Sequence, residues 1–148
     1  PVHRYAQNII ESLNHGVSGW VDWNIVLDRR GGPNHVGNYC GAPIMIDTGA
    51  ADPDTAVYVT PVFTALAQLS RGLRPGDRVV QSAIHAGGAF DDDDLYALAV
   101  RTDWDTLVVH LLNTTKRPLS FDLRVGDRTA AVVMAANALW SVRIGLGP

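Results

Sequence analysis

A change of hydrophobic period near the middle of the chain constrains the fold more than any other sequence feature. After this point six segments alternate between apolar and polar residues, which is the period of a half-buried β-strand. In one of them Leu119 and Phe121 point to one side, whereas Ser120 and Asp122 point to the other. Short strands at near-regular spacing predict an antiparallel β-sandwich. The six segments are 78–86, 95–102, 105–113, 118–125, 128–135 and 138–144.

The first half of the chain has a helical pattern followed by a continuous apolar run. Residues 3–15 place Tyr5 and Ile9 in one apolar stripe, which predicts an amphipathic helix. We expect this helix to end at Gly16. The run 17–27 is apolar, β-branched or aromatic at most positions, as in a strand buried on both faces. This order predicts a piece of an α/β sheet or barrel.

A long segment, 28–56, separates this predicted strand from the next helix. It is rich in Gly, Pro, Asn and Asp, and only 43–47 has the pattern of a short extended segment. A loop of this length after a buried strand is usually functional. A second helix is predicted over 61–71, because Pro61 suits a first helical turn and Gly72 a helix end.

Composition limits the class of protein and its partners. A chain of 148 residues fits one domain, or one domain with an appendage, and 47% hydrophobic with 18% charged residues indicates a globular chain. The net charge of −3, without a cluster of basic residues, argues against nucleic acid or an anionic membrane surface as partner. The sequence contains no apolar stretch long enough to span a membrane and no signal-peptide pattern in this stretch, so the compartment stays unknown.

The motif with the most chemistry is Gly-Trp-Val-Asp-Trp-Asn, residues 19–24, which Gly-Gly-Pro-Asn follows a few residues later. Taken alone, Trp20 and Trp23 are more typical of core packing than of a ligand platform. The role of Asp22 could be limited to hydrogen bonds with backbone groups at a strand end, and Asn34 is by default a turn former. An indole can also cover the C–H face of a sugar ring, and an amide can donate to and accept from hydroxyls.

The order of these features resembles the C-terminal part of the glucosylceramidase-like enzymes of glycoside hydrolase family 30. The similarity extends through Asn38, Pro43 and Ile44 and covers essentially the whole chain. It implies a fold that is mixed α/β and then all-β. Residues 1–75 would form the terminal helix–strand–helix piece of a (β/α)8 barrel, and residues 76–148 an antiparallel β-sandwich.

The resemblance also implies the residues of a sugar site, at the C-terminal ends of the barrel strands. Trp23 would line the sugar subsite. Asn38, in the long segment after the predicted strand, which would form a loop at the rim of the barrel, would hydrogen-bond sugar hydroxyls. Asp22 and Asn24 would be supporting or rim groups. The implied substrate is a β-glucoside such as glucosylceramide, a sphingolipid, and the implied chemistry needs no metal and no organic cofactor.

Two departures from the family pattern limit what the resemblance implies. His35 and Tyr39 leave the side of the site that would meet the aglycone undefined. Retaining glycosidases need two carboxyl groups about 5 Å apart, and in this family both are Glu on earlier strands. The sequence contains a single Glu, Glu11, which we expect on a solvated helix face. We therefore predict that this chain alone does not hydrolyse glycosides.

The alternative to part of an enzyme is a non-catalytic β-sandwich module that binds carbohydrate or another protein. In either case the predicted strand 17–27 would lack neighbours, and unpaired edges with apolar surface favour association. We expect self-association, strand exchange or a complementing upstream segment. Because residue 1 is Pro, we also expect the sequence to begin partway through a longer one.

Other candidate sites are weaker. A thiol-protease pair of Cys40 and His35 lacks a third group, and a lone Cys is usually a buried small hydrophobe. The five His residues show no zinc-binding spacing. The acidic run 91–94 is expected to be a solvated hairpin loop, with calcium binding as the lesser alternative. Asn113 begins a glycosylation sequon, which has little meaning without a secretory signal.

Overall fold

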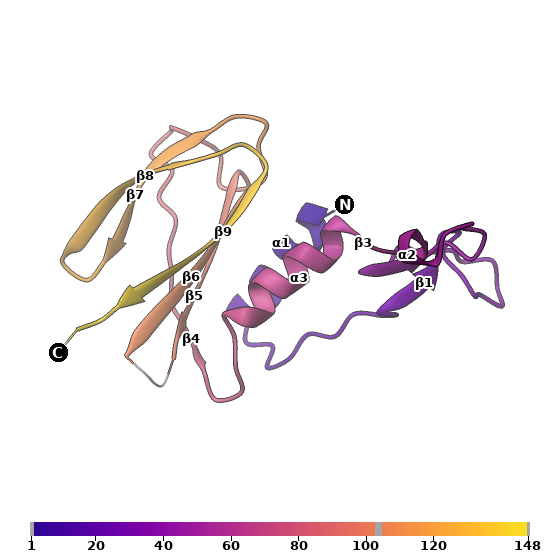
Figure 1. The fold of residues 1–148 in the computed structure, drawn as a ribbon. Helices are drawn as coiled ribbons and strands as arrows, with labels where there is room; N and C mark the ends of the chain where they lie inside the picture. The colour runs from indigo at the N-terminus through magenta and orange to yellow at the C-terminus, as the bar shows by residue number, and fades with distance from the viewer. Residues whose placement is uncertain (1, 103–104, 148) are drawn as a thin grey trace.

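The computed structural model describes residues 2–102 and 105–147, in which two helices lie against a larger sheet (Figure 1). Helix α1 spans Val2–Asn14 and helix α3 spans Pro61–Arg71, which confirms both predicted helices. Pro occupies the first helical position of α3, where its missing N–H costs no hydrogen bond. The helix ends at Arg71, and the N–H of the next residue, Gly72, donates a hydrogen bond to the carbonyl of Leu69.

The six predicted strands of the second half all form, as one sheet and one hairpin. The sheet is antiparallel, in the order β4-β5-β6-β9, and β7 pairs with β8. The first strand is shorter than the predicted 78–86. The strands are β4 (Arg78–Val80), β5 (Leu95–Arg101), β6 (Thr106–Asn113), β7 (Leu119–Val125), β8 (Arg128–Met134) and β9 (Ala138–Gly145).

The two central strands of the large sheet, β5 and β6, have core residues on both faces. On one face Leu98 of β5 packs with Ile10 of α1 and Leu69 of α3. On the other face the core includes Leu119 and Met134, from the β7–β8 hairpin. Strand β6 lies inside the sheet and is buried at seven of its eight positions, so the polar side chains of His110 and Asn113 are buried together with its apolar ones.

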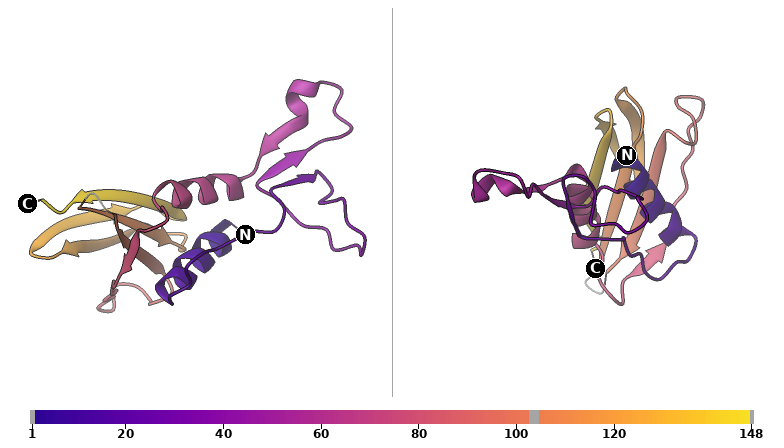
Figure 2. Two further views of the ribbon diagram at one scale, coloured as in Figure 1. Left: turned by 90° about the horizontal axis from the view of Figure 1, so that it is seen from below. Right: turned by 90° about the vertical axis from the view of Figure 1, so that its right-hand side faces the viewer.

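A small sheet projects away from the helices and the large sheet (Figures 1 and 2). It contains β1 (Val26–Asp28), β2 (Ile44–Ile46) and β3 (Val57–Val59). β1 runs parallel to β2, and β3 runs antiparallel to it. A one-turn helix, α2 (Pro53–Ala56), precedes β3. The buried core of this small sheet contains Leu27, Ala42 and Met45.

The prediction of a strand buried on both faces at 17–27 is wrong for most of its length. Only the last two residues of that run belong to β1, and residues 17–25 form no strand. The side chain of Val21 is 92% exposed and that of Ile25 is 70% exposed. The physical reason is that β1 has one strand neighbour, β2, and no segment in the described part of the chain pairs with residues 17–24.

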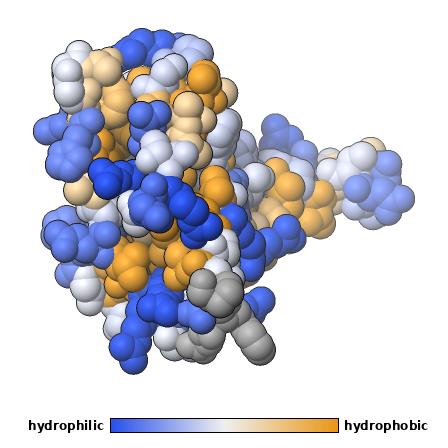
Figure 3. Space-filling view, turned by 90° about the vertical axis from the view of Figure 1, so that its left-hand side faces the viewer, coloured by the Kyte–Doolittle hydropathy of each residue, from blue (hydrophilic) through white to orange (hydrophobic). Residues whose placement is uncertain are grey.

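The face formed by the large sheet and the hairpin carries hydrophilic and hydrophobic side chains interspersed over its surface (Figure 3). Most of the large apolar side chains that are strongly exposed lie elsewhere. They belong to the 17–26 segment, to the loop of residues 28–42, which we call the rim loop, and to the small sheet. Among the helices described here, none combines the length and the apolar character that crossing a bilayer would require.

Candidate functional site

The segment that carries the Trp-Asp-Trp-Asn motif begins at the C-terminal end of α1. Gly16 adopts a left-handed conformation, with φ of 85°, at the position where a helix commonly ends. The N–H of Gly16 donates to the carbonyl of Leu13, and the N–H of Val17 donates to the carbonyl of Ser12, so two of the carbonyls in the last turn of α1 are satisfied. The chain then turns back along the helix, which brings Trp20 over α1.

Trp20 is a packing residue, as the sequence alone suggested. Its ring meets that of Tyr5 edge to face, with centroids 6.1 Å apart and planes at 73°. Its indole Nε1 donates a hydrogen bond of 2.7 Å to Asn8 Oδ1. The ring also packs against the core cluster between the helices and the sheet.

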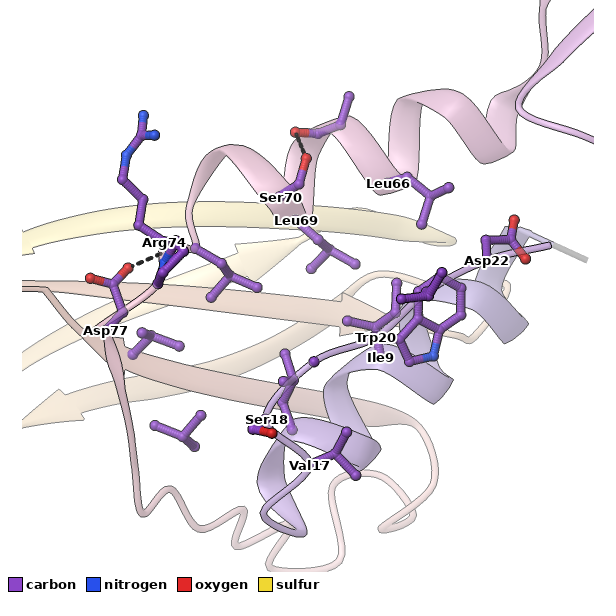
Figure 4. Close-up of a pocket in the computed structure, with 18 of the residues that line it drawn as sticks. Ile9, Val17, Ser18, Trp20, Asp22, Leu66, Leu69, Ser70, Arg74 and Asp77 are labelled. Carbon is purple, nitrogen blue, oxygen red and sulfur yellow. Dashed lines mark hydrogen bonds between the residues drawn. The ribbon is translucent and has the colours of Figure 1, made fainter. Parts of the chain in front are cut away.

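A groove of about 1030 Å³ lies between α1, α3 and the 17–25 segment. Leu66 and Leu69 project into it from α3, and Trp20 lies across from them beside Ile9 (Figure 4). Its walls are mainly apolar. Asp22 and Asn24 line the same groove, so the structure places two of the four predicted site residues on one surface.

The carboxylate of Asp22 has one oxygen atom that is left without a hydrogen bond from the residues that the structure describes. Its Oδ2 atom is buried and has no hydrogen-bond partner among the described residues. A buried carboxylate oxygen without a donor is costly, which is why such atoms commonly mark a position for a missing partner. The carboxylate also lies near Tyr5, whose pKa is raised first by burial and next by the charge of Asp22.

The rim loop, residues 28–42, is held by side-chain caps at two places. The carboxylate of Asp28 accepts hydrogen bonds from the N–H groups of Arg30 and Gly32, at 2.8 and 2.9 Å. The bond from Gly32, followed by the one from Arg30, outweighs the opposing effect of desolvation and lowers the pKa of Asp28. The Gly32–Pro33 peptide bond in this loop is cis.

Asn34 is the second cap of the rim loop and the turn former that its context predicted. Its Oδ1 accepts from the N–H groups of Val36 and Asn38, at 2.8 and 3.1 Å. Its Nδ2 donates to the carbonyl of Asn38 at 2.6 Å. The backbone of Asn38 is therefore fixed on both sides by one side chain. The Asn38 side chain itself is exposed and makes no hydrogen bond with the residues that the structure describes.

The other two predicted site residues do not line the groove. Trp23 is 81% exposed, and Asn38 lies in the rim loop. No hydrogen bond or ring contact joins Trp23 to Asn38 in the described part of the chain. The structure thus brings Asp22 and Asn24 together at the groove and leaves Trp23 and Asn38 on open surface.

The weaker candidates from the sequence are structural or exposed. Cys40 is exposed, and its Sγ contacts the carbonyl of Asn38, not His35. In the acidic run, Asp94 forms an ion pair of 3.3 Å with Arg117. Within residues 2–102 and 105–147, no group of three or more His, Cys, Asp or Glu side chains is placed to hold a metal ion.

The sequon at Asn113 is closed. The side chain of Asn113 is fully buried, and its Nδ2 donates to the carbonyls of Arg117 and Ala135, at 3.0 and 2.9 Å. Its Oδ1 accepts from Thr115. Asn113 therefore closes the turn after β6 and offers no free amide for glycosylation in the folded chain.

Two polar clusters were not predicted from the sequence. One joins Gln68 of α3, Ser141 of β9 and His110 of β6, with 2.7 Å between His110 Nδ1 and Ser141 Oγ. His110 is completely buried, and burial lowers its pKa to about 4. The other cluster surrounds Trp20 on the outer side of α1. Both depend on contacts between residues far apart in sequence.

Comparison with known proteins gives a consistent result. Residues 2–73 match the model of the glycosyl hydrolase family 30 TIM-barrel domain. The chain is 32% identical over 143 residues to putative glucosylceramidase 4 of Caenorhabditis elegans, covering 95% of this chain and 24% of that protein. It is 34% identical over 124 residues to lysosomal acid glucosylceramidase of Mus musculus, covering 84% of this chain and 22% of the mouse protein. The chain thus spans about a quarter of the length of these relatives.

Solved structures agree with the sequence relatives. SrfJ from Salmonella typhimurium superposes with a TM-score of 0.80 at 26% identity, covering 94% of this chain and 30% of SrfJ. An endo-β1,6-glucanase superposes with a TM-score of 0.74 at 19% identity, over 95% of this chain and 31% of the glucanase, which shows a shared fold. By these matches the chain belongs to glycoside hydrolase family 30, among its glucosylceramidase-like proteins.

Proposed function

We propose that this chain is the C-terminal part of a retaining β-glycosidase that hydrolyses a β-glucosidic bond, with glucosylceramide or a similar β-glucoside as substrate. Residues 1–75 would complete a (β/α)8 barrel and residues 76–148 would form its β-sandwich. The names of the C. elegans and mouse relatives support this substrate class. The match to a barrel-domain model, which ends at residue 73, supports the barrel part.

The observation that carries the proposal is the exposure of Trp23 beside a groove that already holds Asp22 and Asn24. An indole that is 81% exposed is available to cover the C–H face of a sugar ring. The free amide of Asn38 can donate to one hydroxyl and accept from another. In the complete site, Trp23 and Asn38 would contact the sugar, with Asp22 and Asn24 at the rim.

The exposed apolar side chains around this site support the proposal that a further segment packs against them in the complete enzyme. Val21, Ile25, Val57 and Val59 are each more than half exposed. A TIM barrel has eight parallel strands, and a strand with free edges and exposed apolar residues tends to pair. We propose that an upstream segment covers this surface in the complete enzyme. In its absence, we expect self-association of the chain.

The two catalytic carboxyl groups would come from that upstream segment. Glu11, the single Glu of the sequence, lies on α1 outside the groove. A retaining enzyme needs two carboxyl groups about 5 Å apart on either side of the bond that is cleaved. We therefore expect the 148-residue chain alone to leave an aryl β-glucoside unhydrolysed.

A chimera tests the proposal. Residues 1–148 replace the matching C-terminal segment of the mouse lysosomal acid glucosylceramidase, and hydrolysis of an aryl β-glucoside is measured. We expect activity that Trp23→Ala and Asn38→Ala each reduce at least about tenfold, since each removes a sugar contact. Trp140→Ala, on β9, is the matched control and should leave activity within about twofold. A folded chimera that is inactive, or an active one indifferent to both changes, would refute the proposal.

The second candidate function is a non-catalytic β-sandwich module that binds carbohydrate or another protein. The observation in its favour is that the large sheet and the hairpin have their own core, in which the side chains of Leu119 and Met134 are buried. This function predicts that the isolated chain is a stable monomer and that the folded chimera has no activity. Light scattering at high micromolar concentration separates it from the first candidate, which predicts association.

A further inference from the structure

A second hollow, of about 600 Å³, lies along the outer side of α1, and we call it the α1 shelf. Five of its residues belong to α1, and four of them recur at the spacing i, i+3, i+4 and i+7, which places them on one face of a helix. The sixth comes from the segment that turns back along the helix. The α1 shelf contains Arg4, Tyr5, Gln7, Asn8, Glu11 and Trp20.

The aromatic part of the shelf is already in place without a ligand. Trp20 is held by its edge-to-face contact with Tyr5 and by the 2.7 Å hydrogen bond to Asn8. Because both rings are fixed, a ligand that stacks there pays little entropy to order them. Trp20 also lines the groove described above, so its indole separates the two hollows.

The polar part of the shelf has unused donors and acceptors. Gln7 Nε2 donates to the hydroxyl of Tyr96 at 3.0 Å, and this bond leaves Gln7 Oε1 as an acceptor. Asn8 uses Oδ1 for the indole and keeps Nδ2 as a donor. Neither Arg4 nor Glu11 forms an ion pair with another residue in the described ranges. Donors and acceptors therefore stand side by side along one helix face.

This combination selects the class of ligand. One Arg and one Glu give the shelf no net charge, so an anion would meet Glu11 and a cation would meet Arg4. Fixed aromatic rings beside mixed donors and acceptors suit a ring with an apolar C–H face and several hydroxyls. We propose that the α1 shelf is a second binding site, for a neutral sugar ring, distinct from the Trp23 and Asn38 surface. The proposal stands whether the chain is part of an enzyme or a binding module.

Titration of the ¹⁵N-labelled chain with methyl β-glucopyranoside, followed by NMR, tests the shelf. We expect saturable shifts of the Trp20 indole N–H and the Asn8 side-chain amide, with a Kd in the range of about 1–10 mM. Glu11→Gln and Arg4→Gln should each raise the Kd about fivefold, since each removes a charged hydrogen-bonding partner and leaves the helix intact. Arg78→Gln, on the distant β4, is the matched control and should leave the Kd unchanged.

Three results would overturn the proposal. The first is the absence of saturable shifts at sugar concentrations up to about 50 mM. The second is equal shifts with inorganic phosphate or with free arginine, which would make the shelf a surface for charged ligands. The third is loss of the shelf signals in Asn38→Ala with no effect of Glu11→Gln, which would place the sugar at the rim loop. None of these results bears on the activity of the chimera, so the two proposals fail separately.

Discussion

Acidification should destabilise this chain through His110. The imidazole is completely buried between β6 and the end of α3, and its pKa is about 4. In the unfolded chain an imidazole has a pKa near 6.5. Because the folded-state pKa is the lower of the two, the unfolded state binds the proton more readily. Stability is therefore complete above about pH 6.5 and falls as the pH drops toward 4, where the loss levels off.

The size of the effect follows from the two pKa values. The pKa of His110 is about 2.5 lower in the folded chain than in the unfolded chain. Because of this difference, the unfolding free energy at pH 4.5 is lower than at pH 7.5 by up to about 2.5 kcal/mol. For a domain of this size that is a sizeable share of the total stability. Asp28, whose pKa is lowered by its backbone hydrogen bonds, adds its own loss only as the pH falls through the carboxylate range.

Urea denaturation at pH 7.5 and 4.5 measures the loss, and His110→Gln isolates the part due to the imidazole. We expect the variant to be less stable at pH 7.5 and to lose about 2 kcal/mol less than the unchanged chain on acidification. His85→Gln, at an exposed position, should behave like the unchanged chain. NMR titration of the His110 ring gives its pKa directly. Equal losses in all three proteins, or a His110 pKa near 6.5, would refute this reasoning.

Three further predictions concern single residues. Gly72→Ala should cost about 1–3 kcal/mol, because the new Cβ would lie 2.7 Å from the His110 ring, whereas Gly19→Ala, with open space around it, should cost little by urea denaturation. Trp20→Ala should lower the unfolding free energy by about 2 kcal/mol, while Trp23→Ala should change it by less than about 0.5 kcal/mol, as measured by the same method. Asn113→Ala should cost about 1–3 kcal/mol, because buried backbone carbonyls lose their donor; glycosylation of folded Asn113, seen by mass spectrometry, would contradict this account.

The elements that the sequence predicts well are those whose signals are local. Pro61 and Gly72 mark both ends of α3, and the structure places the helix at 61–71. The alternating segments form strands because one side of each can meet a buried face, as Leu119 does. These patterns do not depend on which segment becomes the neighbour in space.

The run 17–27 shows where local pattern fails. A continuous apolar stretch is typical of a strand buried on both faces, but burial requires strands on both sides. Here β1 pairs only with β2, and Val21 and Ile25 remain exposed. In the small sheet, the short extended segment predicted at 43–47 is confirmed as β2, whereas β3 was not predicted. A strand of three residues is too short for periodicity to indicate, so its formation depends on tertiary pairing, here the pairing of β3 with β2.

Part of the candidate site could be predicted because its residues are close in sequence. Asp22 and Asn24, two residues apart in the motif, line one groove. The contact of Trp20 with Asn8 spans twelve residues and depends on how the chain turns back after Gly16. The spacing of polar residues on α1 was visible in the sequence, but only the fold shows that an aromatic ring lies against them.

The two proposed sugar contacts would depend on the proposed upstream segment to different degrees. Asn34 fixes the backbone of Asn38 through two hydrogen bonds inside the rim loop, so this half of the site is formed within the chain itself. The backbone of residues 18–24 makes no hydrogen bond with the described residues, so nothing comparable fixes Trp23. Pairing of this segment with a further strand would supply those bonds and cover Val21. We infer that strand pairing, rather than any movement of the rim loop, is the step that would bring Trp23 into register with Asn38.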